Sequence, residues 1–238
     1  MTRLSININK VATLRNARGG NVPDVIQVAK DLELYGANGI TVHPRPDERH
    51  IRYSDVKELS TIVTTELNIE GNPKERKFID LVLETNPTQV TLVPDSQIQL
   101  TSDHGWDTVK NKDYLLETLA LFKKQGIRTS IFVDADLAMV NGASEVGSDR
   151  IELYTESYAA RYGQDREQSI LAFADAAKRA SKLGLGLNAG HDLDRKNLKY
   201  FAQNIPNLLE VSIGHAFIAD SLYFGLENTV GLYLRELR

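Results

Sequence analysis

The sequence predicts an α/β protein of the (β/α)8, or TIM, barrel class, with extra short helices in its loops. Short apolar runs alternate with longer amphipathic stretches along the whole chain, and glycines stand where the helices should end. The chain has 238 residues, close to the roughly 250 that such a barrel typically needs. No linker-like segment divides it, so residues 1–238 are expected to form a single domain.

Eight runs of four to six residues, mostly rich in Ile, Val and Leu, have the composition of buried parallel strands. These predicted strands cover residues 4–8, 39–43, 67–70, 89–93, 128–133, 150–154, 184–188 and 209–213. Each is followed by a stretch with the length and pattern of a helix. The predicted helices cover residues 23–35, 54–65, 74–85, 113–125, 137–146, 166–183, 194–203 and 216–237.

Several helix boundaries have a local cause. Pro23 stands where the first turn of a helix accepts proline. Glycine follows four predicted helices, where a left-handed cap is favourable, at Gly36, Gly126, Gly147 and Gly184. Two connections, 102–111 and 156–165, are longer than usual and are expected to hold extra structure, with a short helix in the second. An open doubly wound sheet is the competing architecture, but no dinucleotide-type glycine fingerprint follows the first strand.

Composition excludes several classes of site. The chain has no cysteine, which rules out disulfides, thiolate metal centres and cysteine nucleophiles. The net charge of -4 argues against a general nucleic-acid surface but not against phosphate, because a few local cations suffice to bind a small anion. No stretch of 18 apolar residues and no secretory signal is visible, so we expect a cytoplasmic protein without a membrane span.

Polar residues, and one glycine, stand at or just beyond the ends of the predicted strands, and in this fold the active site lies at those ends. These residues are Asn7, Asn9, His43, Arg45, Glu70, Asp134, Asp136, Glu152, Asn188, His191, Gly214 and His215. With His50, four of the five histidines lie at or just beyond the strand ends, which favours an enzyme. Each feature also has a structural interpretation. A lone histidine can be a hydrogen-bonded core residue, Glu70 an ion-pair partner, and Asp134 and Asp136 helix caps.

Three segments are suited to phosphate. Residues 43–50 hold two arginines and two histidines beside prolines, and residues 12–20 hold Arg15 and Arg18. Arginine matches phosphate oxygens with two parallel hydrogen bonds. Gly214 and His215 lead into the last predicted helix, whose N-terminus can bind an anion. Two anionic groups are therefore expected in the substrates, although a solvated loop with local ion pairs is the alternative for residues 43–50.

These segments together resemble the pyridoxine 5′-phosphate synthase family over nearly the whole chain. The long carriers are residues 7–18 (NINKVATLRNAR) and 39–51 (GITVHPRPDERHI). Shorter ones follow in order at 68–70 (NIE), 92–94 (LVP), 132–136 (FVDAD), 188–191 (NAGH) and 213–216 (IGHA). The resemblance implies a barrel commonly assembled as an octamer. It also implies condensation of 1-deoxy-D-xylulose 5-phosphate with 3-amino-2-oxopropyl phosphate to give pyridoxine 5′-phosphate, without a metal or organic cofactor.

By position, the resemblance implies that His43 and Glu70 accept protons and that His191 donates one. It implies an amino-ketone phosphate site at Asn7, Arg18, Gly214 and His215, and a pentulose phosphate site at Asn9, Lys10, Arg45, His50 and Thr101. Two positions depart from the family pattern. Asn9-Lys10 replaces Asp-His, which puts an acid/base role at position 9 in doubt. Asp192 replaces a glycine and is carried over as a substrate contact, where an acidic side chain beside phosphate is unfavourable unless it points away or meets the substrate amine.

Two other functions remain open from the residues. A metal-dependent barrel hydrolase or aldolase could use His43, Glu70, His191 and His215 as ligands, because imidazole and carboxylate suit zinc or manganese. A non-catalytic barrel that binds a phosphosugar would use the same cations without turnover.

Overall fold

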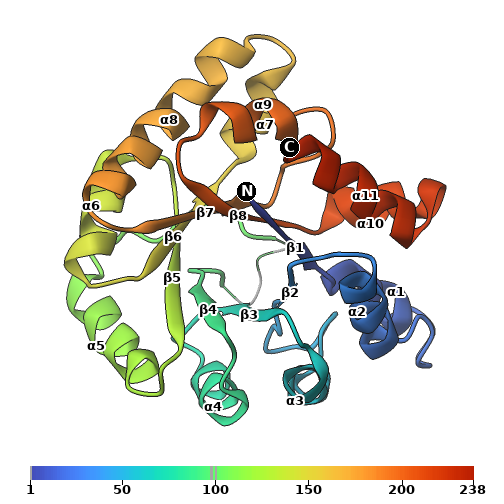
Figure 1. Ribbon diagram of the computed structural model, residues 1–238. Helices are drawn as coiled ribbons and strands as arrows, with labels where there is room; N and C mark the ends of the chain where they lie inside the picture. The colour runs from blue at the N-terminus through green and yellow to red at the C-terminus, as the bar shows by residue number, and fades with distance from the viewer. Residues whose placement is uncertain (1, 97–98, 100) are drawn as a thin grey trace.

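The computed structural model describes residues 2–96, 99 and 101–238. Eight parallel strands close into a barrel in which each strand pairs with its neighbours in sequence and β1 pairs with β8 (Figure 1). The strands are β1 Arg3–Asn7, β2 Gly39–Val42, β3 Glu66–Gly71, β4 Gln89–Leu92, β5 Arg128–Val133, β6 Arg150–Tyr154, β7 Gly186–Gly190 and β8 Leu208–Ile213. The closed barrel confirms the predicted fold class and excludes the open sheet.

Helices surround the barrel on all sides (Figure 1). They are α1 Asn9–Asn16, α2 Val25–Leu34, α3 Tyr53–Ile62, α4 Arg76–Thr85, α5 Lys112–Lys123, α6 Leu137–Glu145, α7 Glu156–Tyr162, α8 Arg166–Lys182, α9 Leu198–Asn204, α10 His215–Phe224 and α11 Leu226–Glu236. Helix α7 is the short helix predicted within 156–165, whereas residues 102–111 form only turns and irregular structure. Within the described part of the chain, no helix combines the length and apolarity needed to span a membrane.

Several element boundaries differ from the prediction, and three of the differences have a local cause. Strand β7 begins at Gly186 rather than at residue 184, because Gly184 has a φ of 75° and the next amide still bonds back into α8. Pro23 lies just before α2, whose N-terminus is capped by Asp24. The single helix predicted over 216–237 is wrong, because Gly225, at φ 77° and ψ 155°, separates α10 from α11. Helix α1 was not predicted.

Alternation along the strands sends apolar side chains outward and polar ones into the barrel. Outward residues such as Ile6, Ile69 and Ile151 are fully buried beneath the helices. Most barrels of this class fill the interior with Val, Ile and Leu. This interior instead holds polar side chains from every strand, which are, in chain order, Arg3, Ser5, Asn7, Thr41, Glu66, Asn68, Glu70, Gln89, Thr91, Arg128, Ser130, Arg150, Glu152, Asn188, Glu210 and Ser212.

Hydrogen bonds join the interior side chains across neighbouring strands. The Ser5 Oγ and Thr41 Oγ1 atoms lie 2.8 Å apart, and Asn68 Nδ2 donates to Thr41 Oγ1 at 3.4 Å. Thr91 Oγ1 in turn donates to Asn68 Oδ1 at 3.0 Å, and Gln89 Nε2 donates to Thr91 Oγ1 at 3.3 Å. Buried polar groups are tolerated only when they are paired in this way. The ladder therefore replaces apolar packing as the filling of this part of the barrel.

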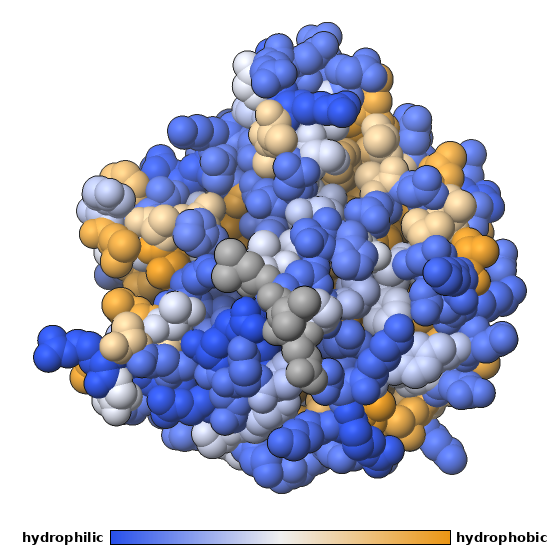
Figure 2. Space-filling model, turned by 180° about the vertical axis from the view of Figure 1, so that it is seen from behind, coloured by the Kyte–Doolittle hydropathy of each residue, from blue (hydrophilic) through white to orange (hydrophobic). Residues whose placement is uncertain are grey.

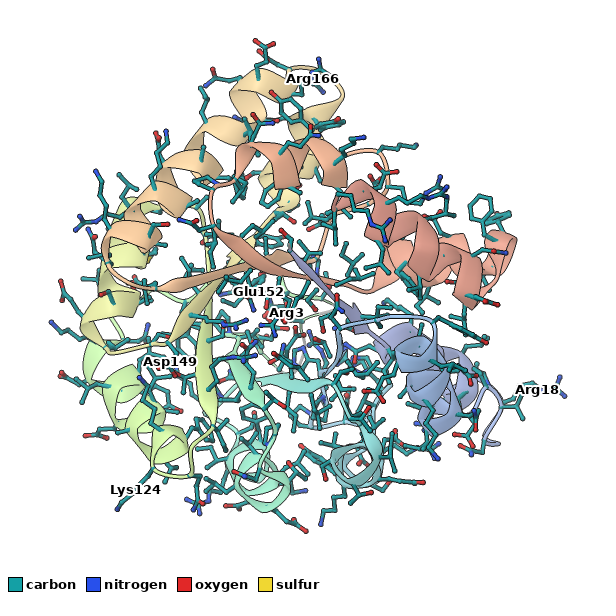
Figure 3. The ribbon with its side chains drawn as sticks, viewed as in Figure 1. Arg3, Arg18, Lys124, Asp149, Glu152 and Arg166 are labelled. Atoms are coloured by element: carbon teal, nitrogen blue, oxygen red, sulfur yellow. The ribbon has the colours of Figure 1, made fainter. Side chains whose placement is uncertain are left out.

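Ion pairs close the amino-terminal mouth of the barrel, which faces the viewer in Figure 3. Glu66 accepts from both Arg3 and Arg128. Arg3 and Arg150 each also approach the buried Glu210 carboxylate at 4.0 Å. Charged groups thus occupy the end of the barrel opposite the predicted active site, and the carboxyls between the two mouths lie away from water.

Two glycine-to-alanine substitutions test whether the break between α10 and α11 requires a glycine. Gly225 has a conformation that only glycine adopts readily, so Gly225→Ala should lower the free energy of unfolding by roughly 1–3 kcal/mol. Gly231→Ala, inside α11 where an added Cβ meets nothing within 4 Å, should raise it by about 0.5–1 kcal/mol. Denaturant unfolding of both variants measures whether the two free energies of unfolding change in opposite directions. A stabilised Gly225→Ala would contradict the glycine requirement.

Candidate active site

A cavity of about 540 Å³ opens at the carboxyl ends of the strands. Figure 2 shows this face, on which hydrophilic side chains predominate. The residues that line the cavity are Asn7, Asn9, Lys10, Thr13, His43, Arg45, Arg49, His50, Glu70, Val93, Thr101, Ser102, Phe132, Glu152, His191, Asp192, Ser212, Gly214 and His215. Residues from both ends of the sequence and from its middle therefore meet at one mouth.

The first two strands fix His43 through asparagines. Asn7, the last residue of β1, accepts a hydrogen bond from the Asn9 amide and donates to Glu70 Oε2 at 3.3 Å. Asn9 begins α1, and its Oδ1 accepts from the His43 backbone N–H at 2.9 Å. The Asn9 side chain thus holds the backbone that follows β2. An amide oxygen at position 9 can therefore accept this hydrogen bond without the carboxylate that the family pattern has there.

His43 and Glu70 form the centre of the cavity. Their Nδ1 and Oε2 atoms lie 4.0 Å apart, and both side chains are largely buried. Burial, followed by the charge of Arg45, lowers the pKa of His43 well below its usual value. Burial, followed by the charge of Asp95, raises the pKa of Glu70 to about 8. At neutral pH the imidazole is therefore an uncharged base, and the carboxyl is mostly protonated.

Glu152 on β6 adds a second buried carboxyl beside Glu70. It is 3% exposed, and its Oε2 has no hydrogen-bond partner among the described residues. Burial raises its pKa well above the usual value, with smaller contributions from Glu70 and Glu210. Two neighbouring carboxyls that hold their protons at neutral pH can donate hydrogen bonds to a substrate oxygen, which an ionised carboxylate cannot do.

His191 lies on the opposite side of the cavity, directly after β7. Its Nε2 is 2.9 Å from Thr101 Oγ1, and its Nδ1 is 2.6 Å from Asp192 Oδ2. The ring also meets the edge of Tyr154, with the ring centroids 5.4 Å apart. Thr101 belongs to the connection that follows β4, so this contact joins two distant segments of the chain across the cavity.

Cationic and polar groups surround these three residues. The buried Arg45 guanidinium donates to Asp95 Oδ2 at 2.5 Å and to the Gln99 carbonyl at 2.7 Å. Burial, followed by the charge of Arg45, lowers the pKa of His50 to about 4, so that ring is neutral. Lys10, at the start of α1, is exposed at the cavity wall. The cavity can thus offer both fixed and mobile positive charge to an anion.

The third polar wall is the start of α10. Gly214 precedes its first residue, His215, and an added Cβ at Gly214 would lie 3.1 Å from Asn7 Cβ. The glycine therefore allows close packing against β1 and leaves the helix N-terminus open toward the cavity. Backbone N–H groups at such a terminus favour a bound anion.

Comparison with known proteins decides the family. The family model of the pyridoxal phosphate biosynthesis protein PdxJ matches residues 4–238. The chain belongs to the PdxJ family. It is 60% identical over 238 residues to a pyridoxine 5′-phosphate synthase of Christiangramia forsetii, with 100% of each chain covered. It is 62% identical over 233 residues to that of Parabacteroides distasonis, with 98% of each covered.

Solved structures show the fold alone. Phosphoribosylanthranilate isomerase of Thermotoga maritima aligns with a TM-score of 0.60 at 13% identity, covering 100% of this chain and 98% of that one. The tryptophan synthase α-subunit of Pyrococcus furiosus aligns with a TM-score of 0.66 at 13% identity, covering 98% of each chain. Both alignments agree with the closed barrel of this PdxJ family member.

Every predicted site residue except Arg18 lines the cavity of this PdxJ family member. Arg18 is exposed on the segment after α1, and in Figure 3 its side chain points outward at the edge of the molecule. Arg15, the other arginine of the 12–20 segment, does not serve phosphate. Its buried guanidinium pairs with both oxygens of Asp55 at 2.7 and 2.8 Å and holds α1 against α3. Asp136 caps α6, as its structural interpretation predicted.

Glu152 lines the cavity but is not among the predicted catalytic or substrate-binding residues, although the sequence places it at a strand end. Figure 3 shows it near the barrel axis, close to the projected position of Arg3. The sequence did contain a signal, because Arg150 and Glu152 are two residues apart in a strand and therefore share the interior face. Among the described residues, no group of three or more His, Asp or Glu side chains is arranged to hold a metal ion.

The raised pKa of Glu70 should appear in the pH dependence of stability. Folded Glu70 keeps its proton up to about pH 8, whereas an unfolded glutamate releases it near its usual pKa. The stability that the folded protein gains by holding the Glu70 proton is fully present below the pKa of the unfolded state. It is lost as the pH rises through the pKa of the folded state. Relative to Glu70→Gln, the wild type should lose up to about 1.4 kcal/mol of unfolding free energy per pH unit in that window.

Denaturant unfolding of both proteins between pH 5 and 9 measures this difference. Glu117→Gln makes the same replacement at an exposed position on α5 and should leave the pH profile of the wild type unchanged. A wild type and a Glu70→Gln variant with parallel profiles would show that the folded and unfolded pKa values are equal.

Proposed function

We propose that the chain is a pyridoxine 5′-phosphate synthase, which condenses 1-deoxy-D-xylulose 5-phosphate with 3-amino-2-oxopropyl phosphate. The products are pyridoxine 5′-phosphate, inorganic phosphate and water. One observation carries the proposal beyond family membership: a single cavity brings together a neutral imidazole, a carboxyl with a pKa near neutrality and a second, oriented imidazole. The reaction needs such a set because imine formation, tautomerisation, phosphate loss, water addition and ring closure each move protons.

The protonation states suggest a division of roles. His43, uncharged at neutral pH, is suited to take a proton from the substrate amine or from a carbon next to a carbonyl. Glu70 lies 4.0 Å from His43 and can exchange a proton on either side of pH 8. His191 faces them as the proton donor. Glu152 is suited to donate a hydrogen bond to a developing negative charge, because burial keeps it protonated.

Two groups of residues suit the two phosphates. Asn9, Lys10, Arg45, His50 and Thr101 all line the cavity and would hold the pentulose phosphate. Asn7, Gly214 and His215 line the wall at the start of α10 and would hold the amino-ketone phosphate. Arg18 belongs to the same proposal, although its outward position requires either movement of its segment or a neighbouring copy of the chain.

We also propose self-association and a cytoplasmic location, as expected from the sequence. Support for self-association comes from the end of α10, where Leu222 is 75% and Tyr223 is 85% exposed. Exposed apolar clusters of this kind commonly mark protein interfaces. The octamer is the size that the family resemblance implies.

The deciding experiment supplies both substrates and follows the formation of pyridoxine 5′-phosphate in protein purified without added metal. Turnover under these conditions, insensitive to a chelator, is the expected result. Activity that is lost in chelator and restored by one divalent ion would favour the metal-dependent hydrolase or aldolase class. Substrate binding without any turnover would favour a non-catalytic phosphosugar-binding barrel.

Glu70→Gln should lower kcat by about 10²–10⁴-fold, the usual contribution of general acid–base catalysis. Glutamine keeps the size and the neutral state of the protonated carboxyl, so KM and the melting temperature near pH 6 should change little. Turnover and melting are measured on the same preparation. If Glu70 is instead an ion-pair partner, stability falls by roughly 3–5 kcal/mol and the folded enzyme turns over normally.

Arg45→Lys tests the pentulose phosphate site while keeping a positive charge beside Asp95. Lysine cannot make two parallel hydrogen bonds, so KM for the pentulose phosphate should rise by about 10-fold, equivalent to about 1.4 kcal/mol. The matched control is Arg76→Lys, at an exposed position on α4, which should leave both KM values unchanged. Steady-state kinetics with each substrate varied in turn gives the result. An unaltered KM in Arg45→Lys would rule out this role.

A further inference from the structure

The pair formed by His191 and Asp192 lies at the rim of the cavity. We propose that Asp192 is a positioning residue, which holds the His191 ring so that Nε2 faces the substrate, and that it does not itself bind substrate. The proposal rests on the proposed function, since it gives His191 its orientation as the proton donor. It also replaces the expectation that Asp192 contacts a substrate.

Hydrogen bonds to both ring nitrogens support this role. The Asp192 carboxylate can only accept, so the His191 Nδ1 atom, 2.6 Å from Oδ2, carries a proton. Nε2 is then the nitrogen that gains and loses a proton, and it lies 2.9 Å from Thr101 Oγ1 at the cavity wall. A carboxylate on one nitrogen thus selects the tautomer in which the other nitrogen is available for proton exchange.

The backbone holds the two side chains together. His191 has a φ of 70°, a left-handed conformation that is uncommon for residues other than glycine, although histidine and asparagine adopt it more often than most. The Asp192 amide donates to the Gly190 carbonyl at 3.1 Å and to Thr155 Oγ1 at 3.3 Å. Asn197 Nδ2 also donates to the Asp192 carbonyl at 3.2 Å. The carboxylate is therefore anchored from its own main chain.

The charge of Asp192 is consistent with this role and not with phosphate binding. A free carboxylate beside two bound phosphates would repel them. The Asp192 carboxylate instead points to the His191 ring, with Oδ2 2.6 Å from Nδ1. The Asp192 side chain is 32% exposed, so water weakens the interaction and a moderate effect is expected, smaller than for a fully buried partner.

Asp192→Ala should lower kcat by about 10- to 100-fold, a part of the 10²–10⁴-fold that a general acid contributes. KM for both phosphorylated substrates should stay within about twofold, because orientation and not substrate binding is lost. Asp192→Asn keeps an oxygen that can accept from Nδ1 and should recover most of the lost kcat. A rise in KM at unchanged kcat would overturn the proposal, and so would equal losses in the two variants.

A double-mutant cycle asks whether Asp192 acts through His191. In a His191→Asn background, where asparagine tolerates the left-handed backbone, Asp192→Ala should cause no further loss of kcat. Losses that multiply would show that Asp192 acts independently of the ring. The control Asp175→Ala removes a carboxylate from the exposed face of α8 and should leave kcat and the melting temperature unchanged.

Crystal structures without substrates decide the positioning independently of activity. The wild type should show the Nδ1–Asp192 and Nε2–Thr101 contacts, and Asp192→Ala should show a rotated or multiply oriented His191 ring. An unchanged ring in the variant would overturn the proposal. If the wild type forms no pyridoxine 5′-phosphate, the proposed function fails, while this comparison still decides whether Asp192 orients His191.

Discussion

The alternation of polar and apolar side chains along the eight strands is the constraint on which the rest of the structure depends. Each strand sends its Ile, Leu and Val toward the helices and its Ser, Thr, Asn, Gln, Glu or Arg into the barrel. The apolar set supplies the core of the domain. Much of the polar set is paired from strand to strand, as Ser5, Thr41, Asn68 and Thr91 are, whereas Ser130 Oγ and Glu152 Oε2 have no partner among the described residues.

The same arrangement sets the chemistry at the carboxyl ends of the strands. Glu70 and Glu152 lie at the carboxyl end of the polar interior, where burial penalises their ionised forms. Arg45 favours the ionised form of Glu70 less than burial opposes it, and it pairs with Asp95. His43 loses its proton for the same physical reason. A neutral base and a protonated carboxyl can therefore lie 4.0 Å apart near neutral pH at His43 and Glu70, although the charge of Arg45 acts on both.

Much of the architecture could be predicted because its causes are local. Glycines at helix ends and runs of strand-forming residues were enough to predict where all eight strands lie. Asp136 caps α6 as expected. The errors arose where the cause lies elsewhere in the chain. Arg15 is buried because it pairs with Asp55, forty residues away in sequence. Glu152 lies inside the cavity because the barrel closes. The outward position of Arg18 follows from where α1 ends, and α1 itself was not predicted.

Burial in a polar barrel keeps Glu70 protonated near neutral pH. Infrared difference spectroscopy of the carboxyl C=O stretch, taken as wild type minus Glu70→Gln across a pH series, observes this proton directly. The account predicts a protonated-carboxyl band that disappears with a midpoint near the pKa of about 8. A midpoint near the usual glutamate value of about 4.3 would contradict it.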